Sequence, residues 1–165
     1  SMRSDVSLQA NTLVSQYEKK CGGQYHTLFL PEFLSEQAYT LMMEEPIVKE
    51  TVQLYDDANI VIHGIGTASE MGKRRKMSEE DNAQLVDKGA VGEAFGYFFD
   101  ESGNVVYRIQ TVGIQIEQVK QSELILAIAG GKSKAMAIEA YFKIAANHTI
   151  LITDEGAADE ILKHG

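Results

Sequence analysis

The feature that most constrains the fold is a run of six apolar residues, Leu124 to Ala129, that leads directly into Gly130-Gly131. An uninterrupted apolar run of this length is typical of a strand buried on both faces of a parallel sheet. A helical apolar pattern follows the glycines, and a further strand at 149–153 precedes a last helix at 156–163. Because parallel strands need a crossover between them, this order predicts an α/β domain.

The rest of the chain repeats the alternation of helices and strands. Further helices are predicted at about 10–21, 35–44, 46–55, from 78 onward, and at 135–145. Further strands are predicted at 27–30, 59–63, 94–99 and 105–109. The last two strands flank the turn-forming segment 100–104, which predicts a hairpin. The predicted fold is a Rossmann-like α/β domain in which helices flank a largely parallel sheet and the hairpin is an insertion.

Four residues mark the ends of predicted helices. Ser35 and Ser78 have the side chain of an N-cap, and Pro46 suits the first turn of a helix. Gly22 is expected to end the first helix, since glycine readily adopts the left-handed conformation found after many helices.

Composition limits the class of protein. The 165 residues are 44% hydrophobic and 24% charged, as in a globular domain. No apolar run approaches the roughly 18 residues of a membrane span, so a membrane protein is not expected. The net charge of −9 argues against nucleic-acid binding by this chain alone, because such binding depends on neutralising phosphates. Cys21 is the single cysteine and no apolar signal segment is present, so we expect a cytoplasmic location.

The turn after the central strand has the composition of a phosphate site. Gly130 and Gly131 allow close backbone approach, and Ser133 is expected to cap the next helix, whose N-terminal N–H groups attract anions. Lys132 and Lys134 add positive charge. The spacing differs from that of a Walker loop. The alternative is an ordinary strand-to-helix turn with solvated lysines, and the residues alone do not decide between the two.

Two other strand ends are candidate sites. The turn at 63–68 resembles half of a dinucleotide fingerprint, although we expect His63 to be a hydrogen-bonded histidine rather than a catalyst. The basic run 73–76 follows this turn closely enough for an arginine to reach a phosphate. Asp154 could orient a sugar hydroxyl, but a cap of the last helix is the preferred interpretation.

Glu93 lies among apolar and glycine residues beside a predicted strand. A carboxylate at such a position is costly to bury without a partner. It could bind a polyol, act as a base, or occupy an exposed edge.

Taken together, these segments resemble the sugar-binding domain of SorC-type bacterial transcriptional regulators, from about Asp5 to the end of the chain. The segments that carry the resemblance are 44–46, 63–66, 92–97, 129–131, 133–135, 138–143 and 153–158. The resemblance implies a fold related to glucosamine-6-phosphate deaminase and ribose-5-phosphate isomerase. It also implies a repressor of glycolytic genes whose effector is a phosphorylated sugar, fructose 1,6-bisphosphate.

The resemblance further implies which side chains bind the effector. These residues are Gln9, Arg74, Glu93, Gly131, Lys132, Ser133 and Lys134. It implies no catalytic residue, metal or cofactor. Lys132 stands where the family has a small residue.

Three parts of such regulators have no counterpart in this sequence: the helix-turn-helix domain, an upstream phosphate loop and a further arginine-bearing loop. We therefore expect residues 3–165 to be the C-terminal part of the effector-binding domain, and Ser1-Met2 to be a cloning scar. Operator DNA would be bound only through the missing N-terminal domain, and the full-length protein is expected to form a homo-oligomer.

An enzyme of the related fold is the alternative. Glu93 or Asp154 would be the base of a sugar-phosphate isomerase or deaminase, or Glu93 the nucleophile of a CoA-transferase-like reaction. Because no acid, base and orienting group cluster in the sequence, binding is the preferred prediction.

Overall fold

A computed structural model describes residues 9–28, 30–31 and 34–164. The helices are α1 (Ala10–Cys21), α2 (Glu36–Glu44), α3 (Pro46–Gln53), α4 (Ala68–Arg74), α5 (Glu79–Asp87), α6 (Ile116–Val119), α7 (Ala135–Phe142) and α8 (Glu155–His164), with a 3₁₀ turn η2 (Lys132–Lys134). The strands are β1 (Ile60–Gly64), β2 (Gly66–Thr67), β3 (Ala90–Ala94), β4 (Tyr97–Asp100), β5 (Val105–Arg108), β6 (Leu124–Ile128) and β7 (Thr149–Ile152). Ser1-Met2, the expected cloning scar, lies outside the described residues.

Two sheets form the core of the fold. The first is parallel, in the order β1-β6-β7, and the second is antiparallel, in the order β2-β3-β4-β5. Helix α7 packs between them: Ile138 and Tyr141, each 1% exposed, share a buried cluster with Ala127 of β6 and Phe99 of β4. This arrangement confirms the predicted α/β fold with a parallel sheet, and the predicted hairpin is β4 and β5 within the second sheet.

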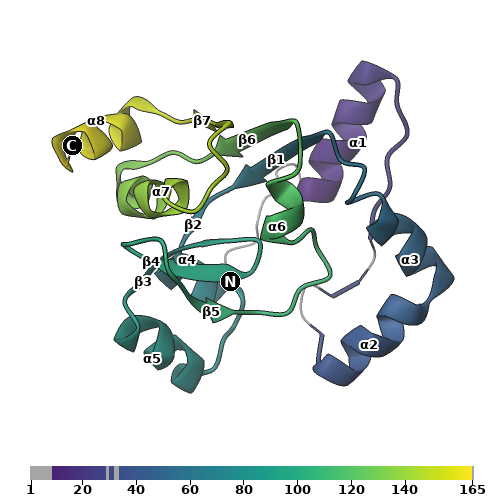
Figure 1. The fold of residues 1–165 in the computed structure, drawn as a ribbon, viewed down its shortest axis with the longest axis horizontal. Helices are drawn as coiled ribbons and strands as arrows, with labels where there is room; N and C mark the ends of the chain where they lie inside the picture. The colour runs from purple at the N-terminus through teal and green to yellow at the C-terminus, as the bar shows by residue number, and fades with distance from the viewer. Residues whose placement is uncertain (1–8, 29, 32–33, 165) are drawn as a thin grey trace.

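Among the described residues, packed elements cover only one of the two faces of the parallel sheet. Val61, Ile125 and Ala127 face the buried side. The isoleucines that alternate with them are 46–56% exposed: Ile60, Ile62, Ile128, Ile150 and Ile152. The prediction that 124–129 is buried on both faces is therefore wrong, because α7 and α8 lie to one side of β6 and β7 (Figure 1).

The predicted strand at 94–99 is interrupted by a tight turn. Phe95 and Gly96 have φ angles of +56° and +87° and connect β3 to β4. Positive φ at both positions is the backbone of a two-residue type I′ turn, whose twist matches that of paired strands. Gly96 is required here, because a Cβ would lie 2.8 Å from the carbonyl oxygen of Ile109. The sequence pattern missed this turn because phenylalanine rarely adopts positive φ.

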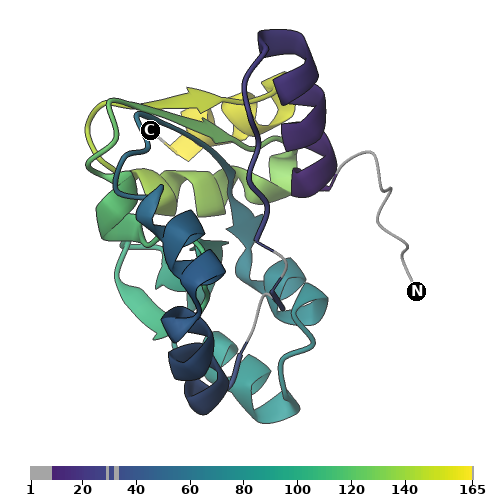
Figure 2. The same ribbon diagram turned by 90° about the vertical axis from the view of Figure 1, so that its right-hand side faces the viewer.

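The N-terminal helices lie on the opposite side of the molecule from α7 and α8 (Figures 1 and 2). The helix ends agree with the predictions: Gly22 is left-handed at φ +74°, Ser35 and Ser78 accept hydrogen bonds from N–H groups in the first turn, and Pro46 begins α3. The strand predicted at 27–30 is wrong for its described residues, which pair with no other strand. An apolar run alone does not make a strand without a neighbour to share its hydrogen bonds.

Candidate functional site

The three turns that the sequence analysis singled out meet at one edge of the parallel sheet. Gly64 of β1 is in register with Ile128 of β6, which is in register with Ile152 of β7. Because the strands run in the same direction, the turns that follow them begin side by side. This is the edge at which open α/β sheets bind ligands.

At this edge, Asp154 links two of the turns. Its Oδ1 accepts a hydrogen bond from the Ala157 N–H at 2.9 Å, and its Oδ2 accepts one from the Gly131 N–H at 2.7 Å. Hydrogen bonds from Ala157 and Gly131 hold the pKa of the Asp154 carboxyl below its ordinary value. The predicted cap of the last helix is confirmed, and the second bond ties that helix start to the Gly130-Gly131 turn.

The start of α7 differs from the prediction. The 3₁₀ turn η2 precedes the helix, with the Lys134 N–H donating to the Gly131 carbonyl oxygen at 2.9 Å. Lys134 therefore occupies the N-cap position of α7 and makes no side-chain cap, so the prediction that Ser133 caps this helix is wrong. The 3₁₀ turn places Lys134, rather than Ser133, directly before the first residue of α7.

The two lysines of the turn have different surroundings. Lys132 is exposed, and its Nζ lies 3.4 Å from Glu160 Oε2 on α8. Lys134 is half-buried, and none of the ion pairs found among the described residues involves it. Of the two lysines of this turn, Lys134 is therefore the one whose charge is not offset by an ion pair among the described residues.

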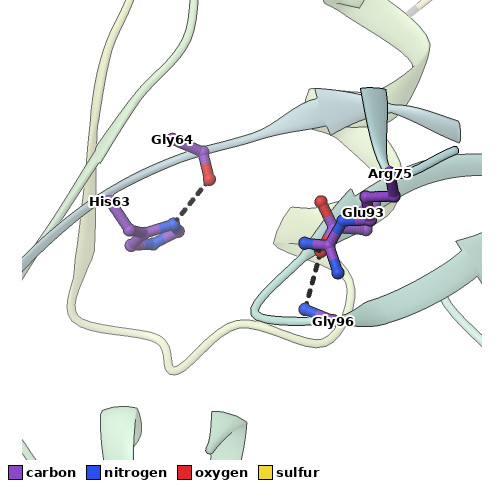
Figure 3. A network of polar contacts seen from close by, with 5 residues as sticks. All are labelled: His63, Gly64, Arg75, Glu93 and Gly96. Atoms are coloured by element: carbon purple, nitrogen blue, oxygen red, sulfur yellow. Dashed lines mark hydrogen bonds and ion pairs between the residues drawn. The ribbon is translucent and has the colours of Figure 1, made fainter. Parts of the chain in front are cut away.

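Glu93 is buried rather than at an exposed edge, and Arg75 is its partner (Figure 3). Arg75 Nη2 lies 2.7 Å from Glu93 Oε1, and the two side chains are 5% and 3% exposed. The same oxygen accepts the Gly96 N–H at 2.6 Å, so one carboxylate joins the end of α4 to the β3–β4 turn. Arg74, the predicted ligand, is the exposed last residue of α4.

Arg75 was not among the predicted site residues, although the sequence contains a signal for it. A buried acid among apolar residues needs a cationic partner, and the basic run at 73–76 is the nearest cluster of positively charged residues in the sequence. Sequence spacing could not decide which of the neighbouring arginines turns inward.

His63 is a hydrogen-bonded histidine, as predicted. Its Nδ1 lies 2.9 Å from the Gly64 carbonyl oxygen (Figure 3), and its Nε2 lies 3.0 Å from the Tyr141 hydroxyl. A carbonyl oxygen only accepts, so Nδ1 carries the proton and Nε2 accepts the hydroxyl of Tyr141. Burial lowers the pKa of His63, and burial raises the pKa of Tyr141 to about 12.

Two cavities of the described surface lie beside Arg75. A cavity of about 250 Å³ is lined by Leu28, Leu30, Pro31, Arg75, Phe95, Thr111, Val112, Gly113 and Ile114. A second, of about 210 Å³, is lined by Leu34, Arg75, Met77, Asp81, Tyr107, Ile109 and Gln110. Gln9, another predicted ligand, is exposed at the N-cap of α1, a helix without buried residues. The structure therefore brings Glu93 to Arg75 and Gly131 to Asp154, and none of the predicted ligands lines either of these two cavities.

Comparison with known proteins identifies the family of this fold. Residues 1–163 match the family described as "Putative sugar-binding domain". The chain is 46% identical over 159 residues to the central glycolytic genes regulator of Bacillus subtilis, covering 96% of this chain and 46% of that protein. It is 31% identical over 131 residues to the transcriptional regulator LsrR of Escherichia coli K12, covering 74% of this chain and 41% of LsrR.

A solved structure agrees with these matches. A SorC family transcriptional regulator from Enterococcus faecalis is 48% identical, with a TM-score of 0.87 over 96% of this chain and 64% of that one. The chain therefore belongs to the sugar-binding domains of SorC-family transcriptional regulators. It spans about half the length of the curated relatives that it matches. The relatives named here are regulators, which confirms the prediction of a binding domain rather than an enzyme.

No helix among residues 9–28, 30–31 and 34–164 is long and apolar enough to cross a membrane.

Proposed function

We propose that this domain senses a phosphorylated sugar, fructose 1,6-bisphosphate, for a repressor of glycolytic genes. The observation that carries the proposal is the 46% identity to the central glycolytic genes regulator over 96% of this chain. The matched region covers 159 of the 165 residues and so spans the segment from Glu93 to Lys134 that holds the Gly130-Gly131 turn.

The turn at 131–134 offers the chemistry that a phosphate needs. No hydrogen bond of the described residues uses the N–H of Lys132 or Ser133, and α7 directs its positive end toward this turn. The charge of Lys134 has no ion pair within the described residues. A phosphate of the sugar would accept hydrogen bonds from the two backbone N–H groups and from the Lys134 ammonium group at the same time.

The remaining proposed contacts belong to the sugar and to the second phosphate. Arg74 is exposed and able to reach an anion, and Gln9 is an exposed hydrogen-bonding side chain. Glu93 Oε1 accepts hydrogen bonds from Arg75 and Gly96, and the two oxygens of a carboxylate together have about four acceptor sites. We assign Glu93 to a sugar hydroxyl, which its buried carboxylate would bind strongly once water is excluded.

Titration calorimetry with fructose 1,6-bisphosphate and with fructose tests this proposal. We expect the bisphosphate to bind and fructose to give no measurable heat, because phosphate contacts supply most of the interaction. Equal binding of the two sugars would show that phosphate is not recognised. The longer regulator chain should bind the bisphosphate more tightly, since each further charge-assisted hydrogen bond contributes roughly 1.5–3 kcal/mol.

We propose that binding of operator DNA and self-association are properties of the whole regulator. The curated relatives are about twice as long as this chain, and the chain itself has a net charge of −9. We therefore expect no sequence-specific DNA binding by this chain at physiological salt. A specific gel shift with the isolated chain would contradict this expectation.

A further inference from the structure

The carboxylate of Asp154 anchors the Gly130-Gly131 turn through the Gly131 N–H. We propose that Asp154 is a positioning residue for anion binding, because it fixes this turn in the conformation that leaves the N–H groups of Lys132 and Ser133 available to a phosphate. The inference rests on the proposed function, and it assigns Asp154 a role beyond its cap of α8.

The two glycines are explained by their contact with Asp154. A Cβ on Gly130 would lie 2.6 Å from Asp154 Oδ2 and 3.0 Å from Asp154 Cγ, so only glycine allows the carboxylate to approach. Gly131 has φ +98°, a conformation that L side chains rarely adopt, and its N–H donates to Oδ2 at 2.7 Å. The two glycines are thus required for the contact with the Asp154 carboxylate, and they affect ligand binding only through this contact.

This contact also decides which backbone groups remain for a ligand. The Gly131 N–H is engaged by Asp154, and the Lys134 N–H is engaged by the Gly131 carbonyl oxygen. The N–H groups of Lys132 and Ser133 lie between these two anchored positions and take part in no hydrogen bond among the described residues. Anchoring both ends of such a short turn removes conformational freedom that a ligand would otherwise have to remove on binding.

The charge of Asp154 makes this inference sharply testable. A carboxylate beside an anion site repels the anion. If Asp154 acted through its charge alone, removal of the carboxylate would therefore tighten phosphate binding. A positioning role predicts the opposite sign, because the turn loses its anchor when the carboxylate is removed. The direction of the change in affinity therefore separates the two roles.

The chain offers a charge-matched control in the neighbouring acid. Glu155 is exposed, and no hydrogen bond or ion pair of its side chain is found among the described residues. Glu155→Gln removes the same charge from the same region and leaves the turn intact. It should therefore report the effect of charge alone.

Two substitutions of Asp154 separate the turn from the helix cap. Asp154→Asn keeps an N-cap of nearly the same size but loses the anionic acceptor. Asp154→Ser also keeps a good N-cap, but its side chain is too short to reach both α8 and Gly131. If capping were the only role, both variants would bind phosphate like the parent chain.

The experiment measures dissociation constants for fructose 1,6-bisphosphate and for inorganic phosphate, together with hydrogen exchange of the Gly131 amide. We expect Asp154→Asn and Asp154→Ser to weaken binding about 10-fold, the change that one lost hydrogen bond produces. Exchange at Gly131 should be faster in both variants. Glu155→Gln should bind as tightly as the parent, or slightly more tightly.

Each result decides a separate claim. Unchanged or tighter binding by the Asp154 variants would overturn the positioning role. Binding of inorganic phosphate without binding of the bisphosphate would refute the proposed effector, and the Asp154 comparison with phosphate would still decide the inference. If the parent bound neither probe, both the proposed site and the inference would be refuted.

Discussion

Arg75 and Glu93 form an ion pair with 2.7 Å between Nη2 and Oε1, and both side chains are almost completely buried. The pair joins the end of α4 to β3 and, through the Gly96 N–H, to the turn that begins β4. Removing charges from water is unfavourable, so a buried pair is tolerated only when its geometry and further hydrogen bonds offset that penalty. Arg75 also lines both cavities, so this ion pair shapes the surface beside the proposed sugar contact.

Loss of one member of this pair should destabilise the domain strongly. Glu93→Ala leaves a buried arginine without its carboxylate, which we expect to lower the free energy of unfolding by about 3–5 kcal/mol. Urea denaturation measures this change. Arg74→Ala is the matched control: because Arg74 is exposed, the change should stay within about 0.5 kcal/mol. A small effect of Glu93→Ala would show that the pair contributes little to stability.

Lys134→Ala should separate binding from stability. A cation at the N-terminus of α7 is unfavourable for the helix, so its removal should leave stability unchanged or slightly raised, within about 0.5 kcal/mol. Binding of fructose 1,6-bisphosphate should weaken about 10-fold or more, as expected for a lost charge-assisted hydrogen bond. The measurement is a titration with each variant, accompanied by a melting curve.

Lys132→Ala is the comparison for this prediction. Lys132 is exposed and paired with Glu160, so its removal should weaken binding less than the removal of Lys134. If Lys134→Ala bound the bisphosphate like the parent, the turn would have no role in phosphate recognition.

Acid should destabilise the domain through His63. Burial lowers the pKa of this histidine below its ordinary value, so the folded protein binds fewer protons there than the unfolded chain. The contribution of neutral His63 to the free energy of unfolding is complete above a pH of about 6.5, and it is lost as the pH falls toward the lowered pKa. Protonation of Nε2 would also break the hydrogen bond from the Tyr141 hydroxyl.

Urea denaturation at a series of pH values from 7.5 to 5 would test this expectation. The stability of His63→Gln should depend less on pH than that of the parent chain. His26→Gln, at an exposed position, should follow the parent profile. Identical pH profiles for His63→Gln and the parent would exclude His63 as the source of the acid sensitivity.

The two faces of the parallel sheet should respond differently to truncation. Ile125→Ala removes a side chain that is 1% exposed, and we expect it to cost about 2–5 kcal/mol of stability. Ile150→Ala, on a strand paired with β6, removes a side chain that is already 50% exposed and should cost about 1 kcal/mol. Equal losses in the two variants would mean that the outer face is covered in solution.

Much of the fold follows from local features of the sequence. Ser35, Ser78 and Pro46 begin helices where predicted, because caps and first-turn residues act on the few N–H groups next to them. The apolar run at 124–129 predicted a parallel strand, because such a run has few other structures available to it. The turn at Phe95-Gly96 could not be predicted in the same way, because the sheet overrides the local preference of phenylalanine.

The sequence by itself determined most of the alternation of strands and helices, the helix ends marked by Gly22, Ser35, Pro46 and Ser78, and the three turns that meet at the edge of the sheet. These depend on periodicity and on residues close together in the chain. Only the tertiary structure decided that Arg75 pairs with Glu93, that Asp154 anchors Gly131, and that one face of the sheet remains exposed. Such contacts join residues 18 or 23 positions apart, and their formation depends on how whole elements pack rather than on the neighbours of either residue.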